Sequence, residues 1–309
     1  MLRSLFLWLS EQRRIFDFVK SNGMARKAAS RFVAGETVDS AVEAARLLNE
    51  KEITASLDLL GESVNSTEQT FVSRDEVIHI LNEIARTGVD ANVSVKLTQM
   101  GLDIDVELCL QNMRMMLSHA KEHDIFIRID MESSEHCERT LQVFEELHPE
   151  FGNLTGVVIQ SYMRRSAKDI EDLIAMGARV RLCKGAYAEP ESVAFQEKAE
   201  VDGSYDRLMK RLLDEGNYPG IATHDERLID RALAYVEAND IPPERFEFQM
   251  LYGVRRDLHY MLREKGFNMR VYVPFGSNWY PYLMRRLAER PGNVAFMTAS
   301  IVKETLSRS

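Results

Sequence analysis

Residues 154–185 read LTGVVIQSYMRRSAKDIEDLIAMGARVRLCKG, and this stretch shows the pattern that decides the fold. It begins with an apolar run at 154–160, continues with a charged segment of helical character, and ends with a second apolar run at 180–185. Strands that are buried on both faces read as near-continuous apolar runs, which is what a parallel sheet requires. The stretch therefore predicts a strand, a helix and a second strand parallel to the first.

The same alternation of apolar runs and helical segments extends along most of the chain. Segments such as 105–124 and 225–240 repeat their apolar residues every three or four positions, as amphipathic helices do. The apolar runs lie at 53–60, 93–98, 125–131, 154–160, 180–185, 220–225, 246–251 and 270–276. Eight strand and helix units in about 250 residues are typical of a (β/α)8 barrel. We therefore expect an α/β fold, with a helical extension over residues 1–50 and one catalytic barrel over residues 51–309.

The composition of the 309 residues is that of a globular protein, with 45% hydrophobic and 28% charged residues. A formal net charge of −9 argues against a nucleic-acid partner, which would need a basic face. The negative net charge does not exclude a small anionic substrate that is bound by a local group of arginines. The three cysteines form no Cys-x-x-Cys pair, so we expect a reducing compartment, no disulfide framework and no metal site. Apolar runs stay shorter than the roughly 18 residues that span a bilayer.

The N-terminal residues 1–16, MLRSLFLWLSEQRRIF, carry apolar residues at helical spacing. Their apolar core is short, lacks a small-residue cleavage site and continues into charged sequence, so a signal peptide is not expected. Two interpretations remain open: a helix that packs on its own domain, and a helix that lies on a membrane surface.

Polar residues recur at the C-terminal ends of the predicted strands, where the chemistry of such barrels takes place. Polar groups at the ends of apolar strands are costly to desolvate unless they find partners. Each of them alone could be a satisfied residue in a loop, but their recurrence favours a site. The strand ends carry Lys96, Asp130, Met131, Gln160, Arg181, Lys184, Gly185, Ala186, Tyr187, Thr223, His224, Asp225, Gln249, Leu251 and Tyr272.

The segment 272–293, YVPFGSNWYPYLMRRLAERPGN, holds five aromatic residues within eleven positions, followed by two adjacent arginines. Residues 276–278 can end the last strand and cap a helix. Tyr282, Arg285, Arg286 and Glu289 would then share one face of that helix. Across the barrel mouth, the two arginines could bind a carboxylate bidentately. The alternative is an ordinary amphipathic helix whose arginines reach solvent.

Lys96 and Asp130 come from adjacent predicted strands and are flanked by apolar residues, so both are expected to point into the barrel. A buried lysine needs a carboxylate partner, and Asp130 is the nearest candidate. The pair could anchor a substrate or could only organise the barrel interior. A Schiff-base role for Lys96 or Lys184 is the rival chemistry.

Other strand ends suggest a bound cofactor. Gly185 would let the backbone approach a ligand closely, and Arg181 would place a positive charge beside an electron-rich ring. His224 could bond a cofactor phosphate or ribose, or could be a core residue. The chain has no GxGxxG, GxxxxGK[ST] or HExxH motif, which argues against Rossmann binding of a dinucleotide, a nucleotide hydrolase and a zinc protease.

Seven segments, in order along the chain, carry a family resemblance. They are SVKLTQMGLDID (94–105), IRIDME (127–132), VVIQSYMRRSAKDIEDL (157–173), VRLCKGAYAEPESVAFQEKAEVDGSYDRLM (180–209), ATHDERLI (222–229), FEFQMLYGVR (246–255) and YVPFGSNWYPYLMRRLAER (272–290). These segments resemble the bacterial monofunctional proline dehydrogenases, which are related to the proline dehydrogenase domain of bifunctional proline utilisation proteins. The resemblance covers the chain from about residue 53 to residue 290.

The resemblance implies a distorted (β/α)8 barrel with FAD at the strand C-terminal ends and a final helix over the barrel mouth. It implies oxidation of L-proline to 1-pyrroline-5-carboxylate, the first step of proline catabolism, by hydride transfer from C5 to flavin N5. Catalytic roles are implied for Asp130, paired with Lys96, and for Arg181 at the flavin N5 edge. The implied substrate residues are Lys96, Ala186, Tyr187, Leu251, Tyr272, Arg285, Arg286 and Glu289. The implied FAD contacts are Met131, Gln160, Arg181, Lys184, Gly185, Ala186, Tyr187, Thr223 and His224.

The resemblance also implies that electrons pass to a membrane quinone, and hence a cytoplasmic protein that meets the inner face of the cell membrane. The sequence leaves the oligomeric state open. Two other functions remain as alternatives: a Schiff-base lyase on the same barrel, and a barrel that binds amino acids or partners without catalysis.

Overall fold

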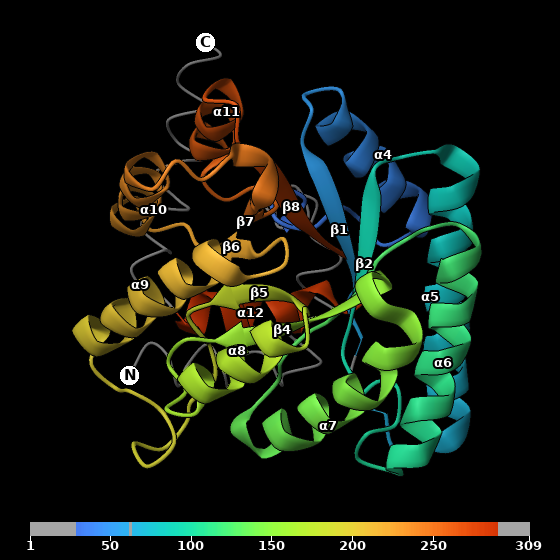
Figure 1. Cartoon of the computed structure of the whole chain (residues 1–309). Coiled ribbons are helices and arrows are strands. Elements are labelled where there is room, and N and C mark those ends of the chain that lie inside the picture. Colours follow the sequence, from blue (N-terminus) through green and yellow to red (C-terminus); the bar gives the residue numbers. More distant parts are fainter. Residues whose placement is uncertain (1–28, 62–63, 290–309) are drawn as a thin grey trace.

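Eight parallel strands close into a barrel in the order of the chain (Figure 1). The computed structural model describes residues 29–61 and 64–289, with the backbone alone for 285–289. The strands are β1 (Thr54–Leu59), β2 (Ala91–Val95), β3 (Ile127–Ile129), β4 (Thr155–Gln160), β5 (Arg179–Cys183), β6 (Gly220–Ala222), β7 (Glu247–Leu251) and β8 (Asn268–Phe275). Each strand overlaps the apolar run that predicted it, so the (β/α)8 barrel is confirmed.

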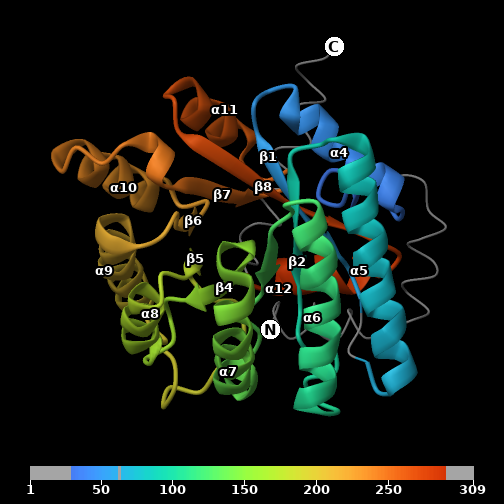
Figure 2. The ribbon, with the colours of Figure 1, turned by 45° about the vertical axis from the view of Figure 1, so that its right-hand side comes forward.

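Helices surround the strands on the outside (Figure 2). They are α4 (Val38–Asn49), α5 (Thr67–Thr87), α6 (Val106–Glu122), α7 (Ser134–Phe151), α8 (Ser166–Ala175), α9 (Lys198–Glu215), α10 (Glu226–Ala238) and α11 (Arg256–Glu264). A further helix, α12 (Trp279–Glu289), follows β8. Several begin at a polar cap: the side chains of Ser66, Asp105 and Asp225 accept hydrogen bonds from N–H groups of the first turns of α5, α6 and α10. The stretch 154–185 forms β4, α8 and β5, as predicted.

The described part of the N-terminal extension packs on the barrel. Helix α4 contacts β1 and β8. The segment before it reaches the C-terminal end of β8, where Ala34 N–H donates to the Pro274 carbonyl at 2.9 Å and Gly276 N–H donates to the Gly35 carbonyl at 3.0 Å. The helices expected in residues 1–28 lie outside the described residues, and the division at residue 50 stays a prediction.

The outward faces of the strands are apolar and form the main core. Leu57, Val93 and Ile127 are in register across β1, β2 and β3, and all three are fully buried. They belong to one continuous cluster with apolar residues of the surrounding helices, such as Ile80 and Met113. Burial of this apolar area is the main favourable contribution to folding.

Many residues on the inward faces, one position away along the strands, are polar. Arg181 on β5 shows this most clearly, because its guanidinium donates to Ser56 Oγ on β1 at 3.3 Å and to Ser94 Oγ on β2 at 3.1 Å. A side chain can reach strands on the far side of the sheet only through the barrel interior. Barrel interiors of this class are commonly filled by branched aliphatic side chains, so this interior is unusual in being a polar network.

An ion pair occupies the interior toward the N-terminal ends of the strands. Arg270 Nε donates to both carboxylate oxygens of Glu247, at 2.9 and 3.0 Å, and Arg270 Nη1 donates to the Ala55 carbonyl at 2.8 Å. Burial acts to raise the pKa of Glu247, but the attraction of Arg270 outweighs it, and the pKa is lowered from its usual value of 4.5. The carboxylate therefore stays charged in the interior at neutral pH.

We expect Glu247→Ala to lower the free energy of unfolding by about 3–5 kcal/mol, because it leaves Arg270 buried without its counter-ion. Urea denaturation at neutral pH measures this loss. The ion pair contributes fully above the usual Glu pKa, so the difference from wild type should shrink as the pH falls through the lower folded-state pKa. Arg46→Ala, at an exposed ion pair on α4, is the control and should leave the urea midpoint unchanged. Equal midpoints for the Glu247→Ala variant and the wild type would contradict the assignment.

Candidate active site

Asp130, at the C-terminal end of β3, lies at the centre of a polar cluster in which Arg181 is buried and Asp130 and Tyr272 are partly exposed. Its Oδ1 accepts from Arg181 Nη1 at 2.8 Å, and its Oδ2 accepts from the Tyr272 hydroxyl at 2.7 Å. The Arg181 guanidinium also lies 5.2 Å from the centre of the Tyr272 ring, within range of a cation–π contact. The cluster brings together three of the residues that the sequence singled out, from three different strands.

The Tyr272 phenol stays protonated in this cluster. Burial raises its pKa well above the usual value, and the negative charge of Asp130 raises it further. The hydroxyl therefore serves as a fixed hydrogen-bond donor to Asp130. With Arg181 on one oxygen and Tyr272 on the other, Asp130 has a single orientation.

Lys96 has a different ion-pair partner from the one expected. Its Nζ donates to Asp58 Oδ1 on β1 at 2.8 Å, and no hydrogen bond to Asp130 is found among the described residues. Asp130 instead accepts from Arg181 on one oxygen and from Tyr272 on the other. Asp58 was missed, although it stands as a lone charge in an apolar run, two residues after Ser56 and therefore on the inward face of β1.

The charge state of Lys96 argues against Schiff-base chemistry. Burial acts to lower its pKa, but the attraction of Asp58 and then of Asp130 outweighs this effect, and the pKa is raised above its usual value. A lysine nucleophile needs a lowered pKa, so Lys96 is a persistent cation instead. This cation is 27% exposed and can still meet an anionic ligand.

Lys184, the other Schiff-base candidate, is held by two carboxylates. Its Nζ donates to Asp202 on α9 at 2.5 Å and to Asp225 at the start of α10 at 2.8 Å. Burial acts to raise the pKa of both acids, but hydrogen bonds from Lys184 help to lower it in each. Lys184 therefore joins α9 to the start of α10 through these two contacts.

Gln160 and Gly185, expected to lie near a cofactor, have features that suit one. Gln160 Nε2 donates to the carbonyls of Met131 at 3.1 Å and Glu132 at 2.7 Å, while its Oε1 is buried with no partner in the described structure. Gly185 has a φ of +107°, and a Cβ added there would lie 2.2 Å from the ring of Tyr162. Gln160 Oε1 could therefore accept a hydrogen bond from a ligand. The backbone at position 185 has a conformation and a close neighbour that favour glycine.

The other expected cofactor and substrate residues lie around the same strand ends. His224 follows β6, and its Nε2 accepts from the Leu251 backbone N–H at 2.9 Å, which joins β6 to β7. Thr223 is buried and its hydroxyl accepts from the Asp225 N–H at 3.1 Å. Ala186 is half-buried and Tyr187 is exposed in the loop after β5. These contacts place the residues at one end of the barrel and leave their expected roles untested.

Helix α12 begins at the C-terminal end of the barrel. Trp279, Tyr282 and Leu283 pack in a buried cluster with Phe32 of the N-terminal segment and with Leu60, which directly follows β1. In both views α12 lies across the middle of the molecule, inside the ring of outer helices (Figures 1 and 2). The side chains of Arg285, Arg286 and Glu289 lie outside the described residues, so their expected roles stay predictions.

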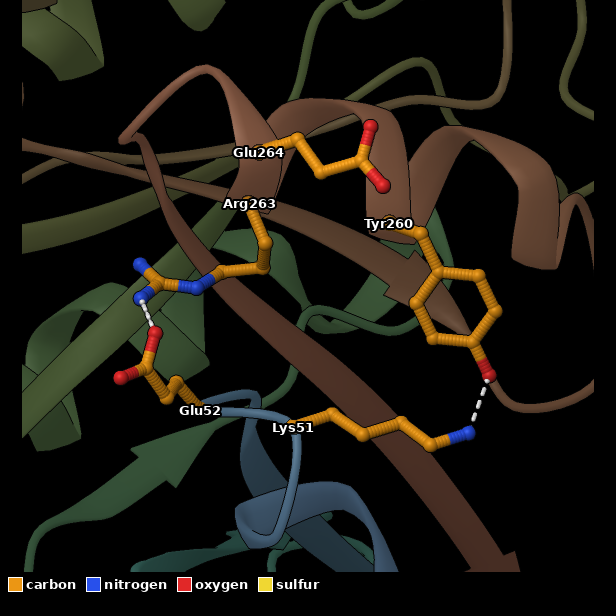
Figure 3. Close-up of a pocket in the computed structure, with 5 residues that line it drawn as sticks. All are labelled: Lys51, Glu52, Tyr260, Arg263 and Glu264. Carbon is orange, nitrogen blue, oxygen red and sulfur yellow. Dashed lines mark hydrogen bonds and ion pairs between the residues drawn. The ribbon is translucent and has the colours of Figure 1, made fainter.

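A surface hollow lies at the other end of the barrel from the Asp130 cluster. It has a volume of about 450 Å³ and is lined by Lys51, Glu52, Tyr260, Arg263 and Glu264 (Figure 3). These residues precede β1 and β8, so the hollow lies at the N-terminal end of the barrel, opposite the expected site. Within it Arg263 pairs with Glu52 at 2.8 Å, and Lys51 Nζ donates to the Tyr260 hydroxyl at 2.8 Å. It lies at the end of the barrel opposite the expected site, so we do not assign it a catalytic role.

The described part of the chain contains no group of three or more His, Cys, Asp or Glu side chains placed to hold a metal ion. None of its helices is both long enough and apolar enough to cross a bilayer.

Comparisons with known proteins agree with the resemblance. The family model described as proline dehydrogenase matches residues 41–299. Over 304 residues the chain is 42% identical to proline dehydrogenase 1 of Bacillus subtilis subsp. natto, covering 98% of this chain and 100% of the relative. It is 43% identical over 279 residues to proline dehydrogenase of Deinococcus radiodurans, covering 89% and 90% of the two chains.

A solved structure shares the fold. It is proline utilization A (PutA) from Bdellovibrio bacteriovorus inactivated by N-propargylglycine, with a TM-score of 0.79 and 28% identity. The match covers 85% of this chain and 32% of that larger chain. The match to the family model, the near-complete coverage of the smaller relatives and the closed barrel lead to one conclusion: this chain belongs to the proline dehydrogenase family.

Proposed function

We propose that the protein oxidises L-proline to 1-pyrroline-5-carboxylate, the first step of proline catabolism, with FAD as cofactor and a quinone as electron acceptor. Family membership supports the activity. The observation in the structure that supports it best is the hydrogen-bonded Arg181–Asp130–Tyr272 cluster, with the Lys96 cation near it, at the end of the barrel where such enzymes act.

The residues at the strand ends fit a flavin. An isoalloxazine ring presents an N–H at its pyrimidine edge, and Gln160 Oε1 is a buried acceptor with no partner among the described residues. Gly185 allows a close approach of the backbone, and Arg181 supplies a positive charge that is fixed in place. Met131, Lys184, Ala186, Tyr187, Thr223 and His224 would complete the cofactor contacts. When bound, FAD supplies the hydride acceptor that no amino-acid side chain provides.

The chain's own residues would bind and orient proline. Lys96, Arg285 and Arg286 would hold its carboxylate, with Glu289 holding an arginine in place. Tyr272, Leu251, Ala186 and Tyr187 would form a wall against its ring and exclude water. This proposed clamp fixes C5 in one position, which is a gain in orientation and not an acid–base effect.

The proline nitrogen must be neutral for C5 to release a hydride. A site that excludes water disfavours the charged ammonium and so favours loss of its proton. The wall of Tyr272 and Leu251 would contribute this effect in the proposed complex. Asp130 is engaged by Arg181 and Tyr272, so we assign it to holding these two side chains and not to accepting the proton.

A quinone acceptor would bring the protein to a membrane surface. We therefore propose a cytoplasmic protein with transient contact at the inner face of the cell membrane. The formal net charge of −9 gives no general attraction to anionic lipid, so such contact would need a local patch or the N-terminal residues.

We expect the purified protein to be yellow, with an absorbance band near about 450 nm that bleaches when L-proline is added without air. The bleaching reports reduction of the flavin by the substrate. D-proline and L-alanine are the comparison ligands and should leave the band unchanged. A colourless protein that sodium borohydride traps with a carbonyl substrate would support the lyase instead, and a protein that does neither would support a silent barrel.

We expect Arg285→Met and Arg286→Met each to raise the KM for proline about 10- to 150-fold while flavin stays bound. The reason is that a hydrogen bond to a charged group is worth about 1.5–3 kcal/mol. Steady-state kinetics with proline measures the KM, and the ratio of flavin absorbance to protein absorbance measures cofactor content. Arg46→Met, on the outer helix α4, is the matched control and should leave both unchanged. Loss of flavin with an unchanged KM would move these arginines from the substrate to the cofactor.

A further inference from the structure

Gln249 on β7 links the Arg181 guanidinium to the ion pair deeper in the barrel. Its Oε1 accepts from Arg181 Nε at 2.5 Å, and its Nε2 donates to Glu247 Oε1 at 2.5 Å. Glu247 is in turn held by Arg270. All four side chains are buried. A continuous series of polar contacts therefore runs from the N-terminal part of the barrel to Asp130 at its mouth.

The two neighbours of Gln249 fix the orientation of its amide. A guanidinium offers only donors and a carboxylate offers only acceptors. A flipped amide would set its NH2 against Arg181 and its oxygen against Glu247, and both hydrogen bonds would be lost. Glutamine supplies an acceptor and a donor without net charge, whereas methionine, of similar length, supplies neither.

The other contacts of Arg181 hold the opposite end of its guanidinium. Nη1 donates to Asp130 at 2.8 Å, and Nη2 donates to Ser94 at 3.1 Å and to Ser56 at 3.3 Å. Among the described residues, Gln249 is the partner of Nε. Without it, Arg181 would have a buried N–H with no acceptor, and the planar group should turn to find one.

The neighbouring strand β6 leaves room for Gln249. A Cβ added at Gly220 would lie 2.5 Å from Gln249 Nε2 and 2.9 Å from its Cδ. Gln249 cannot move aside without losing its bonds to Arg181 and Glu247. Glycine at position 220 is therefore part of the same arrangement.

We infer that Gln249 is a positioning residue, which sets the plane of the Arg181 guanidinium at the strand ends and is itself held by Glu247 and by the space at Gly220. The inference rests on the proposed function in one respect, the assignment of Arg181 to the flavin edge. The hydrogen bond from Arg181 Nε–H to Gln249 involves no cofactor or substrate, so it can be tested without them.

Three variants of the full-length protein test this role. Gln249→Met keeps the volume and removes both hydrogen bonds. Gly220→Ala removes no polar group, but its added methyl group pushes the Gln249 side chain aside. It therefore tests the same contact from another strand. Tyr218→Phe is the matched control, because Tyr218 contacts the same Glu247 at 3.4 Å from outside the series of contacts that leads to Arg181.

The first measurement is hydrogen exchange at Arg181 Nε, followed by ¹⁵N NMR and assigned by its absence in Arg181→Lys. It needs no flavin. We expect slow exchange in the wild type and Tyr218→Phe, and exchange at least about tenfold faster in Gln249→Met and Gly220→Ala, since the bond to Gln249 is lost.

The second measurement uses the flavin-bound protein. A cation at the flavin favours the reduced, anionic form, so displacement of Arg181 should weaken this preference about tenfold, or about 30 mV for a two-electron couple. The kcat should fall about 10- to 100-fold, whereas the KM for proline should change less than about twofold, because other cations hold the carboxylate.

Exchange at Nε that is equally slow in wild type, Gln249→Met and Gly220→Ala would overturn the inference. Faster exchange with an unchanged midpoint potential and kcat would also overturn it, because Gln249 would then be only structural. If one of the two variants fails to fold, the other still tests whether Gln249 positions Arg181. A wild-type protein that neither binds flavin nor responds to proline would refute the proposed function, and the exchange data would still show whether Gln249 holds Arg181.

Discussion

The interior of this barrel is organised around one buried guanidinium. Arg181 cannot lose its charge, and a charge in the interior is tolerated only when its donors are met by acceptors. Side chains from β1, β2 and β7, and Asp130 at the end of β3, supply those acceptors. The position of one side chain thus constrains residues on four other parts of the sheet.

The need of each buried polar group for a hydrogen-bond partner extends from Arg181 toward both ends of the barrel. Toward the N-terminal ends, Gln249 needs a second acceptor for its own NH2, and Glu247 supplies it and is neutralised by Arg270. Toward the mouth, Asp130 receives the Tyr272 hydroxyl, and the charge of Asp130 helps to keep that phenol protonated. A polar network whose groups are hydrogen-bonded to one another gives one arrangement of its members, and the proposed hydride transfer would need such fixed orientation. The aliphatic outward faces supply the burial that offsets the cost of desolvating these groups.

The sequence predicted the strands well because buried parallel strands have a composition that helices and loops do not share. It did not predict side-chain pairing equally well, and Lys96 shows why. Lys96 follows β2, which pairs with both β1 and β3, and each neighbour carries an inward aspartate near the same level, Asp58 and Asp130. Sequence spacing cannot choose between them. The pairing is seen only in the closed barrel, where Arg181 and Tyr272, from distant parts of the chain, bind Asp130 and Lys96 binds Asp58. The part played by Gln249 was hidden for the same reason, since its two partners become visible only when the barrel closes.

The N-terminal segment before α4 helps to hold the start of α12. Tyr282 and Leu283 are buried against Phe32, and Trp279 Nε1 donates to Glu36 at 3.0 Å. A carbonyl of that segment lies close to the loop after β7, because a Cβ on Gly253 would lie 1.7 Å from the Arg31 oxygen. The first turn of α12 is therefore fixed by residues that precede the barrel as well as by the end of β1. If Arg285 and Arg286 bind the substrate as proposed, the described part of the extension, residues 29–50, would help to set where the helix that carries them begins.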